Sequence, residues 1–402
     1  MDVVIIGAGF AGTCMAWMLR EAFDPRIVIL ESDTVPGGML RTFETPDGLA
    51  YEYGPRVVSV FRGTPEFLPF LRGFAKLDER LVYQGTRLRP EFPIVPFPLD
   101  RASLRRLPCG EQIDREIAAI VAADERPGEA NLKHYLESSL GPTLTELAFE
   151  GFNRKFWGRR LEDMPADWGK LRRLETIAEA GDFRLPSRAP HYYPEGGFNP
   201  IFTSMLDGFD VRYGVSVERL ESAGSRTTVI TSRGAVTADV VISTAPIDAI
   251  FEYRFGPLEW RGYRLEIEVA TDDLGKAPDG VPFAWVYTPW AQTPVCRTTD
   301  FGVIHHGRDH DGSRIVVREI ADTGVRMYPV WWEEDRLNRY LEAAAAVPGV
   351  VPLGRLGLYK YVTMDSTYAM ASRLVHMLDE YLGAAPHERV DMLSMLRGDW
   401  SN

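Results

Sequence analysis

Cysteine is scarce in this chain, and its scarcity limits the kind of protein that the sequence can encode. Only Cys14, Cys109 and Cys296 occur among 402 residues, far apart and odd in number. A disulfide framework needs an even set of cysteines, so we exclude one and expect a protein of the reducing cytoplasm. With 45% hydrophobic residues, the chain can bury two or three cores.

Long apolar runs and concentrated positive charge are also missing. No stretch approaches the ~20 apolar residues of a membrane span, and we expect no signal peptide because the chain starts directly in a predicted strand. The net charge is −12, and no basic stripe is present, which argues against nucleic-acid binding. An acidic chain that binds an anionic ligand has to gather its arginines locally, so single arginines matter here.

The first thirty-odd residues carry the most informative pattern. The apolar run 3–6 predicts a buried parallel strand, a helical period follows, and a second strand ends at Glu31. Between the first strand and the helix, Gly7, Gly9 and Gly12 give the spacing G-x-G-x-x-G. These glycines would allow a tight turn, close approach of a pyrophosphate and close helix packing, while Glu31 would bind ribose hydroxyls. The pattern predicts a dinucleotide site at the helix N-terminus.

The next segment bears on whether the dinucleotide is NAD or FAD. Gly37 and Gly38, followed by Arg41, resemble the FAD-binding motif of the glutathione-reductase-type flavoproteins. There the glycines let the chain pass close to the cofactor. A plain loop with two glycines is the alternative. We therefore expect an α/β fold with a Rossmann-like FAD-binding domain.

The remaining patterns predict two further parts. Helical periods over 103–123 and 132–149 follow a loop-rich stretch, the alternation over 263–269 indicates an antiparallel sheet with one wet face, and a helix over 365–382 closes the chain. A buried strand over 240–243 suggests re-entry into the nucleotide domain. We predict a discontinuous FAD-binding domain over 1–75, 195–250 and 345–402, a helical domain over 76–160, and a sheet or substrate domain over 161–194 and 251–344.

Motifs along nearly the whole chain resemble those of the UDP-galactopyranose mutase family. They are Gly-Ala-Gly-Phe-Ala-Gly at 7–12, Tyr-Gly-Pro at 53–55, Gly-Phe-Asn-Arg-Lys-Phe-Trp-Gly at 151–158, Tyr-Pro-Glu-Gly-Gly-Phe at 193–198, Pro-Ile-Asp-Ala at 246–249, Arg297, His-Asp-Gly-Ser at 310–313, Tyr-Pro at 328–329 and Gly-Arg-Leu-Gly-Leu-Tyr-Lys-Tyr-Val-Thr-Met-Asp at 354–365. The resemblance implies an FAD enzyme of glycan biosynthesis that interconverts pyranose and furanose forms of a nucleotide sugar. Reduced flavin would attack the anomeric carbon through N5, expel UDP and let the ring open and reclose without net oxidation.

The resemblance also assigns residues to the phosphates and the cofactor. Arg297 would grip the diphosphate together with a second arginine, either Arg172 or Arg173, of which we take Arg173. Arg355 would lie near the flavin N1–O2 edge. Arg56 would lie at the sugar side of the site. The full set of predicted cofactor-binding residues is Gly7, Gly9, Phe10, Ala11, Gly12, Glu31, Ser32, Gly38, Met39, Arg56, Val57, Val217, Arg355, Tyr361 and Met364.

Aromatic residues complete the substrate site that the resemblance implies. Tyr328 and Tyr361 would donate to the phosphates, with Tyr193 as a further candidate, although buried tyrosines also serve packing. Phe152 and Trp157 would stack on uracil and frame the nucleotide, unless these aromatics belong to the core. Asn153, between them, replaces a family threonine and stays polar.

A metal site is not expected. His305, His306 and His310 lie close together in sequence, but with no recognised ligand spacing, and His-Asp-Gly-Ser at 310–313 is better interpreted as a hairpin turn.

The sequence also departs from the family. Arg56 and Ser59 stand where the family has histidines, and Thr363 replaces an aspartate. Arg56 could bind a carboxylate or phosphate on a different sugar, reposition the flavin, or only preserve a backbone contact. Two other functions therefore remain open: a flavin oxidoreductase of amine-oxidase-like type, and a diverged protein that binds the nucleotide sugar without mutase turnover. A homodimer is an open possibility.

Overall fold

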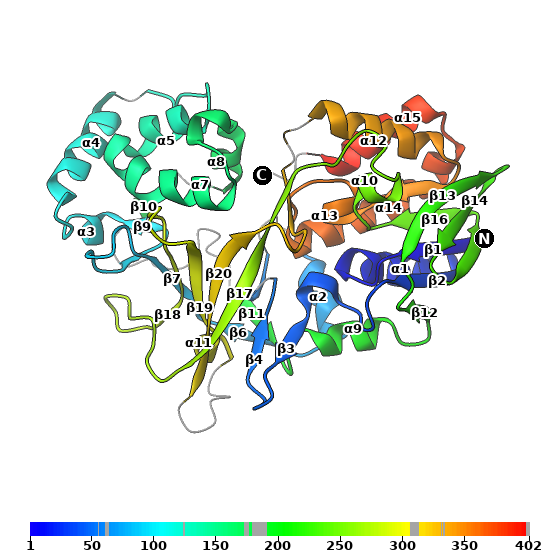
Figure 1. Cartoon of the computed structure of the whole chain (residues 1–402), viewed down its shortest axis with the longest axis horizontal. Helices are drawn as coiled ribbons and strands as arrows, with labels where there is room; N and C mark the ends of the chain where they lie inside the picture. Colours follow the sequence, from blue (N-terminus) through cyan, green and yellow to red (C-terminus); the bar gives the residue numbers. More distant parts are fainter. Residues whose placement is uncertain are drawn as a thin grey trace.

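The computed structural model describes residues 1–54, 56–60, 64–123, 125–172, 177–178, 191–305, 313–330, 332 and 334–398. Three groups of elements can be followed in Figure 1. A parallel sheet with its helices lies at the right, a cluster of helices lies at the upper left, and long antiparallel strands lie between and below them.

The parallel sheet contains the predicted N-terminal strand and the predicted re-entrant strand side by side. Its order is β12-β2-β1-β16-β22, and every pairing is parallel. The five strands are β1 (Asp2–Ile6), β2 (Arg26–Glu31), β12 (Asp210–Tyr213), β16 (Val240–Ser243) and β22 (Val350–Pro352). Segments separated by more than 200 residues thus form one sheet, which confirms the Rossmann-like α/β fold.

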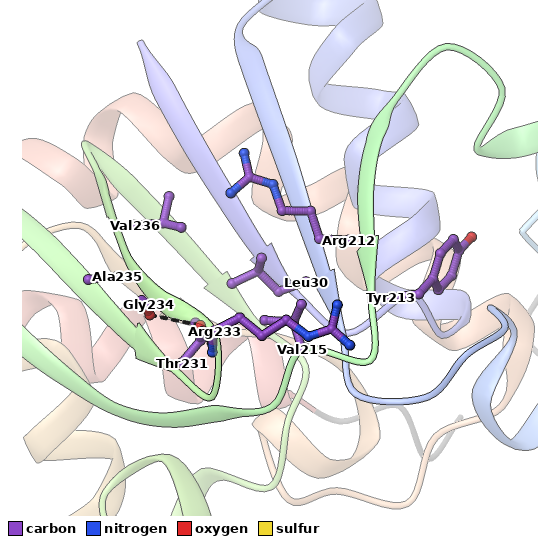
Figure 2. A pocket seen from close by; sticks show the side chains of 9 residues that line it. All are labelled: Leu30, Arg212, Tyr213, Val215, Thr231, Arg233, Gly234, Ala235 and Val236. Atoms are coloured by element: carbon purple, nitrogen blue, oxygen red, sulfur yellow. Dashed lines mark hydrogen bonds between the residues drawn. The ribbon is translucent and has the colours of Figure 1, made fainter.

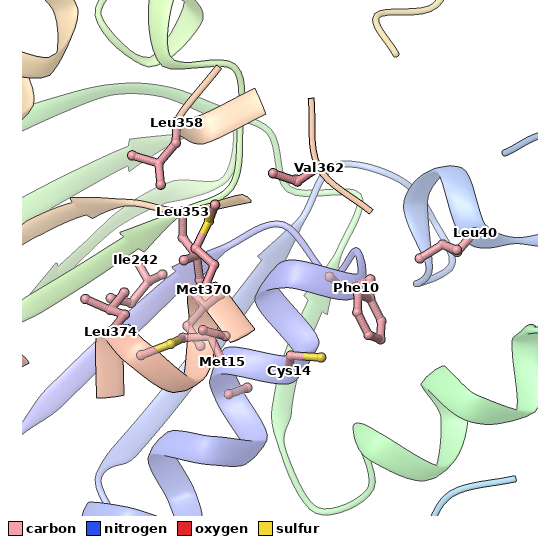
Figure 3. Close-up of a cluster of buried hydrophobic side chains, with 14 of the residues drawn as sticks. Phe10, Cys14, Met15, Leu40, Ile242, Leu353, Leu358, Val362, Met370 and Leu374 are labelled. Carbon is pink, nitrogen blue, oxygen red and sulfur yellow. The ribbon is translucent and has the colours of Figure 1, made fainter. Parts of the chain in front are cut away.

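Both faces of this sheet are covered, which explains why β1 is apolar from Val3 to Ile6. Val3 and Ile5 pack with the helices α1 (Phe10–Phe23) and α14 (Met364–Gly383), as Figure 3 shows for Met15, Ile242 and Met370 of this cluster. Val4 and Ile6 face the opposite way, in a cluster that includes Val229 and Ala238. This second layer is a three-stranded meander of β13 (Val217–Ala223), β14 (Arg226–Thr231) and β15 (Gly234–Ala238).

The second large sheet has seven strands in the order β21-β17-β20-β19-β18-β7-β8. They are β7 (Tyr83–Thr86), β8 (Val95–Pro96), β17 (Trp260–Ala270), β18 (Phe283–Tyr287), β19 (Val295–Asp300), β20 (Arg314–Asp322) and β21 (Tyr328–Pro329). Only the β7–β18 pairing is parallel. The predicted one-sided burial of β17 is only partly correct: Tyr263 is buried, but Ile267 and Val269 are exposed. Neither side chain belongs to a buried cluster of the described residues, so this part of the sheet face is not covered.

The helical region is more broken than its periodicity predicted. Its helices are α3 (Arg101–Leu104), α4 (Gly110–Ala123), α5 (Leu132–Leu140), α6 (Pro142–Thr145), α7 (Gly151–Phe156) and α8 (Ala166–Arg172). The predicted helix over 132–149 is interrupted at Gly141, whose φ is 86°, and Pro142 starts the next helix. The strands β6 (Leu77–Arg80), β7 and β8 lie where loops were predicted. The domain boundaries themselves stay predictions.

The remaining helices and strands complete the described chain. They are α2 (Phe67–Arg72), α9 (Asn199–Met205), α10 (Ile247–Ile250), α11 (Phe301–His305), α12 (Glu334–Ala346), α13 (Gly354–Gly357), α15 (Pro386–Arg397), β3 (Thr42–Glu44), β4 (Ala50–Glu52), β5 (Val58–Ser59), β9 (Leu99–Asp100), β10 (Ile177–Ala178) and β11 (His191–Pro194), with single helical turns at Gly38–Leu40 and Leu161–Asp163 and a wider helical turn at Glu146–Glu150. None of the helices within the described ranges combines the length and the apolar character that crossing a bilayer requires.

Candidate functional site

The glycine-rich turn has the geometry that its spacing predicted. Gly7 has a φ of 100°, and its N–H donates to the carbonyl of Leu30 over 2.8 Å. A Cβ on Gly12 would lie 2.0 Å from the carbonyl oxygen of Gly7, so only glycine lets helix and strand approach this closely. A Cβ on Gly9 would meet no atom within 4 Å, because Gly9 borders open space. That space lies where a pyrophosphate was expected.

The N-terminus of α1 is available to an anion. Its N-cap residue, Gly9, provides no side-chain cap, and no acidic residue lies in the first helical turn. The free N–H groups and the positive end of the helix dipole therefore face the open space beside Gly9. The residues present here fit a bound dinucleotide.

Glu31 is held in place beside this helix end. Its Oε2 accepts from the N–H of Ala8 over 2.7 Å, and its Oε1 accepts from the N–H of Asp33 over 2.8 Å. Oε1 also accepts from the hydroxyl of Ser32 over 3.3 Å, whereas Oε2 keeps a second lone pair, so Glu31 can still accept from a ribose hydroxyl. The carboxylate at the end of β2 thus matches the predicted ribose-binding role in position, and the role itself stays a prediction.

A cavity of about 600 Å³ runs from this turn to the antiparallel sheet. Its size is typical of cofactor and ligand sites. Sixteen of the residues predicted for the site line it: Gly7, Gly9, Phe10, Ala11, Glu31, Ser32, Gly38, Met39, Arg56, Val57, Val217, Arg297, Tyr328, Arg355, Tyr361 and Met364. The predicted residues that do not line it are Gly12, Phe152, Asn153, Trp157 and Tyr193. Arg173 lies outside the residues that the structure describes.

A second hollow of about 370 Å³ lies between the parallel sheet and the meander. Figure 2 shows Leu30 and Val215 at its base and the guanidinium groups of Arg212 and Arg233 around it. Arg212 is engaged with Asp210 over 2.9 Å. This hollow lacks the glycine turn and the helix N-terminus, so the larger cavity is the candidate site.

The sheet end of the cavity carries two buried arginines that share one carboxylate. Arg297 of β19 donates through Nε and Nη2 to the two oxygens of Glu319 on β20, over 3.0 and 2.8 Å. Arg56 forms an ion pair with the same Glu319 and donates to the carbonyl of Gly54. Glu319 is fully buried. A bidentate guanidinium–carboxylate pair of this kind fixes the plane of Arg297.

Burial also affects the charge of Arg56. Removal from water, and then the nearby positive charge of Arg297, lower the pKa of the Arg56 guanidinium to about 9. At neutral pH the group is still protonated. The two arginines and Glu319 therefore carry a net charge of +1 at this end of the cavity.

Sequence reasoning missed several residues at this end. Gln84, Trp285 and Tyr287 also line the cavity, and the indole N–H of Trp285 donates to Gln84 Oε1 over 2.8 Å. Arg297 lies 5.6 Å from the ring centre of Tyr287. Glu319 does have a sequence signal: on β20 it shares a face with Val317 and Ala321, two residues away on either side, and a carboxylate on an apolar face needs a buried partner.

Tyr328 and Tyr361 also line the cavity. Their rings stack with centres 5.8 Å apart, and the guanidinium of Arg355 lies over both. Arg355 Nη2 donates to the carbonyl of Val362 over 2.6 Å. Further along, the hydroxyl of Thr363, where the family has an aspartate, donates to Asp365. The cavity thus brings buried arginines and stacked tyrosines together.

The segment 151–158 packs the helical region against the sheet. A Cβ on Gly151 would lie 2.2 Å from the carbonyl oxygen of Pro289, so α7 approaches the loop after β18 closely. Lys155 Nζ donates to two backbone carbonyls at the ends of β18 and β19. Asn153 donates to the carbonyl of Phe149, and Trp157 is only 2% exposed. Of the aromatic residues proposed for uracil, Phe152 alone is partly exposed, beside Tyr287.

Tyr193 lies in a separate buried network. Its hydroxyl donates to Glu52, which also faces His305 Nε2 at 3.2 Å. Nearby, Ser59 lines the cavity, and its Oγ lies 2.6 Å from Nδ1 of His191. Burial lowers the pKa of His191 to about 4, so this imidazole is neutral at pH 7. The structure does not bring Tyr193 to the substrate side.

Within the described ranges no group of three or more His, Cys, Asp or Glu side chains is arranged to hold a metal ion. His306 and His310, and with them most of the predicted hairpin turn at 310–313, lie outside these ranges.

Comparison with known proteins adds evidence of a different kind. The family model described as UDP-galactopyranose mutase matches residues 147–361, and that of an NAD(P)-binding Rossmann-like domain matches residues 5–74. The chain is 22% identical to the UDP-galactopyranose mutase of Mycoplasma pneumoniae, with 92% of this chain and 94% of that protein covered. It is 21% identical to the dTDP-fucopyranose mutase of Escherichia coli, with 90% and 94% covered. The crystal structure of a reduced UDP-galactopyranose mutase superposes with a TM-score of 0.75 at 16% identity over 98% of each chain, which shows a shared fold.

Proposed function

The chain belongs to the UDP-galactopyranose mutase family of nucleotide-sugar pyranose/furanose mutases, and on that premise we propose that it interconverts UDP-galactopyranose and UDP-galactofuranose, or a close relative of this pair, with reduced FAD as its cofactor. The observation that carries the proposal is one continuous cavity. It joins a dinucleotide-binding turn to a wall of buried arginines and stacked tyrosines.

The proposed cofactor is consistent with the glycines at one end of the cavity. Gly9 and the N-terminus of α1 would hold the diphosphate of FAD, and Glu31 would hold its ribose. Bound in its reduced form, FAD would supply a nucleophile for the anomeric carbon of the sugar. Met39, Val57 and Met364 would line the cofactor and exclude water.

The opposite end would hold the leaving nucleoside diphosphate. Arg297 is rigidly oriented by Glu319 and stays charged, as a phosphate-binding group must. Tyr328 and Tyr361 would donate hydroxyl hydrogens to the same phosphates. Arg297 would thereby stabilise the negative charge that develops as the anomeric C–O bond breaks, and it would keep the diphosphate near the sugar for the return step.

The test is a panel of nucleotide sugars offered to the protein after reduction with dithionite. UDP-galactopyranose, dTDP-fucopyranose and a GDP-sugar are incubated in turn, and the pyranose and furanose forms are separated by chromatography. We expect exchange with the first and no consumption of an electron acceptor. Oxygen-dependent turnover by the oxidised protein, with a reduced protein that is inert, would instead establish the alternative of a flavin oxidoreductase. Binding of nucleotide sugars without exchange would establish the diverged binding protein.

A further inference from the structure

The two cavity arginines are not independent, because one carboxylate serves both. Glu319 of β20 is the direct cross-strand partner of Arg297 of β19. Its side chain is 0% exposed, against 4% for Arg56 and 12% for Arg297. The hydroxyl of Thr299 approaches the same Glu319 Oε1 at 3.4 Å. Glu319 is therefore saturated by protein groups and has no surface left for a ligand.

Arg56 is likewise occupied within the protein. Its three nitrogens lie against Glu319, the carbonyl of Gly54 and the hydroxyl of Thr299. Arg56 thus reaches the cavity wall with its guanidinium engaged by protein oxygens, and it shares the Glu319 carboxylate with Arg297. A sugar carboxylate placed beside it would compete with Glu319 and would bring a second negative charge next to the first.

Among the described residues that line the cavity, Arg355 is a further cation. It donates to the backbone carbonyls of Val362 and Met327 and covers the tyrosine rings, and these contacts leave its positive charge in place. The net positive charge of these arginines would be balanced by the nucleoside diphosphate. A carboxylate on the sugar would add a further negative charge beside Arg56 and Arg297, whose guanidinium groups are already engaged by Glu319.

We propose that Glu319 is a positioning residue for Arg56 and Arg297, and that the wall they form commits the cavity to nucleotide sugars whose sugar ring is uncharged, excluding uronic acids. This inference rests on the proposed function, and it narrows the substrate class. It also addresses whether Arg56 binds a carboxylate or phosphate on a different sugar. The arginine that replaces a family histidine is an internal ion-pair partner and not a receptor for a charged sugar.

The first experiment compares UDP-galactose with UDP-galacturonate, in which a carboxylate replaces the hydroxymethyl group of the sugar. Affinities are measured by isothermal titration for both the oxidised and the reduced protein, so that binding is known whether or not turnover occurs. We expect the uronate to bind at least about tenfold more weakly, a difference of about 1.4 kcal/mol. Equal or tighter binding of the uronate would overturn the inference. Failed exchange with the affinity ratio intact would remove the mutase proposal alone, and binding of neither sugar would remove both.

The second experiment releases Arg56 by substitution. In Glu319→Gln the neutral amide cannot form the ion pair with Arg56, so the affinity for UDP-galacturonate relative to UDP-galactose should rise roughly tenfold. With UDP-galactose as substrate, kcat should fall by a larger factor than KM rises. Glu319→Asp, which keeps the carboxylate, should restore the ratio and part of kcat. An unchanged ratio in Glu319→Gln would contradict the positioning role.

A matched control comes from the neighbouring buried pair of the same sheet. Asp300 is fully buried and pairs with Arg314 at 2.9 Å, but it does not line the cavity. Asp300→Asn should lower the melting temperature as Glu319→Gln does and leave the affinity ratio unchanged. If Glu319→Gln does not fold, Arg56→Gln provides the test. We expect it to leave the affinity for UDP-galacturonate as weak as in the unsubstituted protein. A loss of affinity for UDP-galacturonate alone, with UDP-galactose binding unchanged, would show that Arg56 does bind the sugar carboxylate.

Discussion

The two ends of the cavity are built in opposite ways. The dinucleotide end consists mainly of backbone from the glycine turn and the N-terminus of α1, to which the side chain of Glu31 adds a carboxylate, all within the first 38 residues. The sheet end consists of side chains that come from distant segments, with Arg56, Arg297 and Glu319 converging from separate strands and loops. Backbone groups are the same in every residue, whereas side-chain charges change with each substitution.

This difference explains where the chain departs from its family. The dinucleotide end needs glycine where a Cβ would collide with the chain, as at Gly12, or would fill the open space expected for the cofactor, as at Gly9, and the motif is intact at both positions. At the sheet end, a charged side chain that differs from the family residue is accommodated when an oppositely charged group lies beside it. Arg56 is accommodated because Glu319 is already present to pair with Arg297 and can hold a second guanidinium. We therefore expect substrate preference to depend on the sheet end and cofactor binding to depend on the dinucleotide end.

The largest expected effect separates the two ends directly. Arg297→Ala should lower kcat/KM for UDP-galactopyranose by roughly a thousandfold, about 4 kcal/mol, because the diphosphate loses its charged partner. The cofactor absorbance of the purified protein should stay at the level of the unsubstituted chain. Turnover like that of the unsubstituted protein would remove Arg297 from the phosphate role, and loss of the cofactor would show that the two ends are coupled.

The next effect tests which aromatic residues of α7 belong to the core. Trp157 is 2% exposed and packs against Trp168 and Trp332, so Trp157→Ala should lower the free energy of unfolding by about 3–5 kcal/mol in urea titrations. Phe152→Ala, at a partly exposed position beside Tyr287, should destabilise less and should raise KM for the nucleotide sugar. Equal stability losses with an unchanged KM would assign Phe152 to packing as well.

A pair of glycine substitutions tests the dinucleotide end. In Gly12→Ala the new Cβ would meet the backbone carbonyl of Gly7 at 2.0 Å, so unfolding free energy should fall by about 2–3 kcal/mol. Gly9 has a φ of −75°, which alanine adopts freely, and no atom lies within 4 Å of the new Cβ. Gly9→Ala should therefore keep the stability of the cofactor-free protein, measured by thermal unfolding, and weaken FAD binding. A destabilised Gly9→Ala with normal cofactor affinity would contradict the assignment of the open space.

The last expected effect concerns pH. The pKa of His191 falls from 6.5 to about 4 on folding, so between these values only the unfolded chain takes up the proton. Stability should therefore rise with pH from 4 to 6.5, by at most about 3 kcal/mol from this residue. Unfolding midpoints of the unsubstituted protein and of His191→Gln, each at pH 4.5 and pH 7, measure how much His191 contributes to the pH dependence of stability, because glutamine does not titrate. An identical slope in both proteins would mean that His191 is accessible to protons in the folded state.

Prediction from sequence succeeded where the determining contacts are local. The turn at Gly7, the packing at Gly12 and the place of Glu31 at the end of β2 all follow from spacing within one strand–helix–strand unit. Prediction was weaker where contacts are distant. The aromatic residues at 151–158 looked equally suited to a ligand and to a core, and only their packing partners show that Trp157 is buried. Tyr193 looked suited to a phosphate, and its partner is Glu52.

The sequence by itself determined the fold class, the dinucleotide turn and the family, because strand periodicity and glycine spacing are local properties of the backbone. The tertiary structure alone decided the state of Arg56. The sequence predicts a cation at position 56, on the sugar side of the site. Whether such a buried cation can bind a ligand depends on the protein groups within hydrogen-bonding distance of it. The ion-pair partner of Arg56, Glu319, is 263 residues further along the chain and reaches it only through the register of the antiparallel sheet.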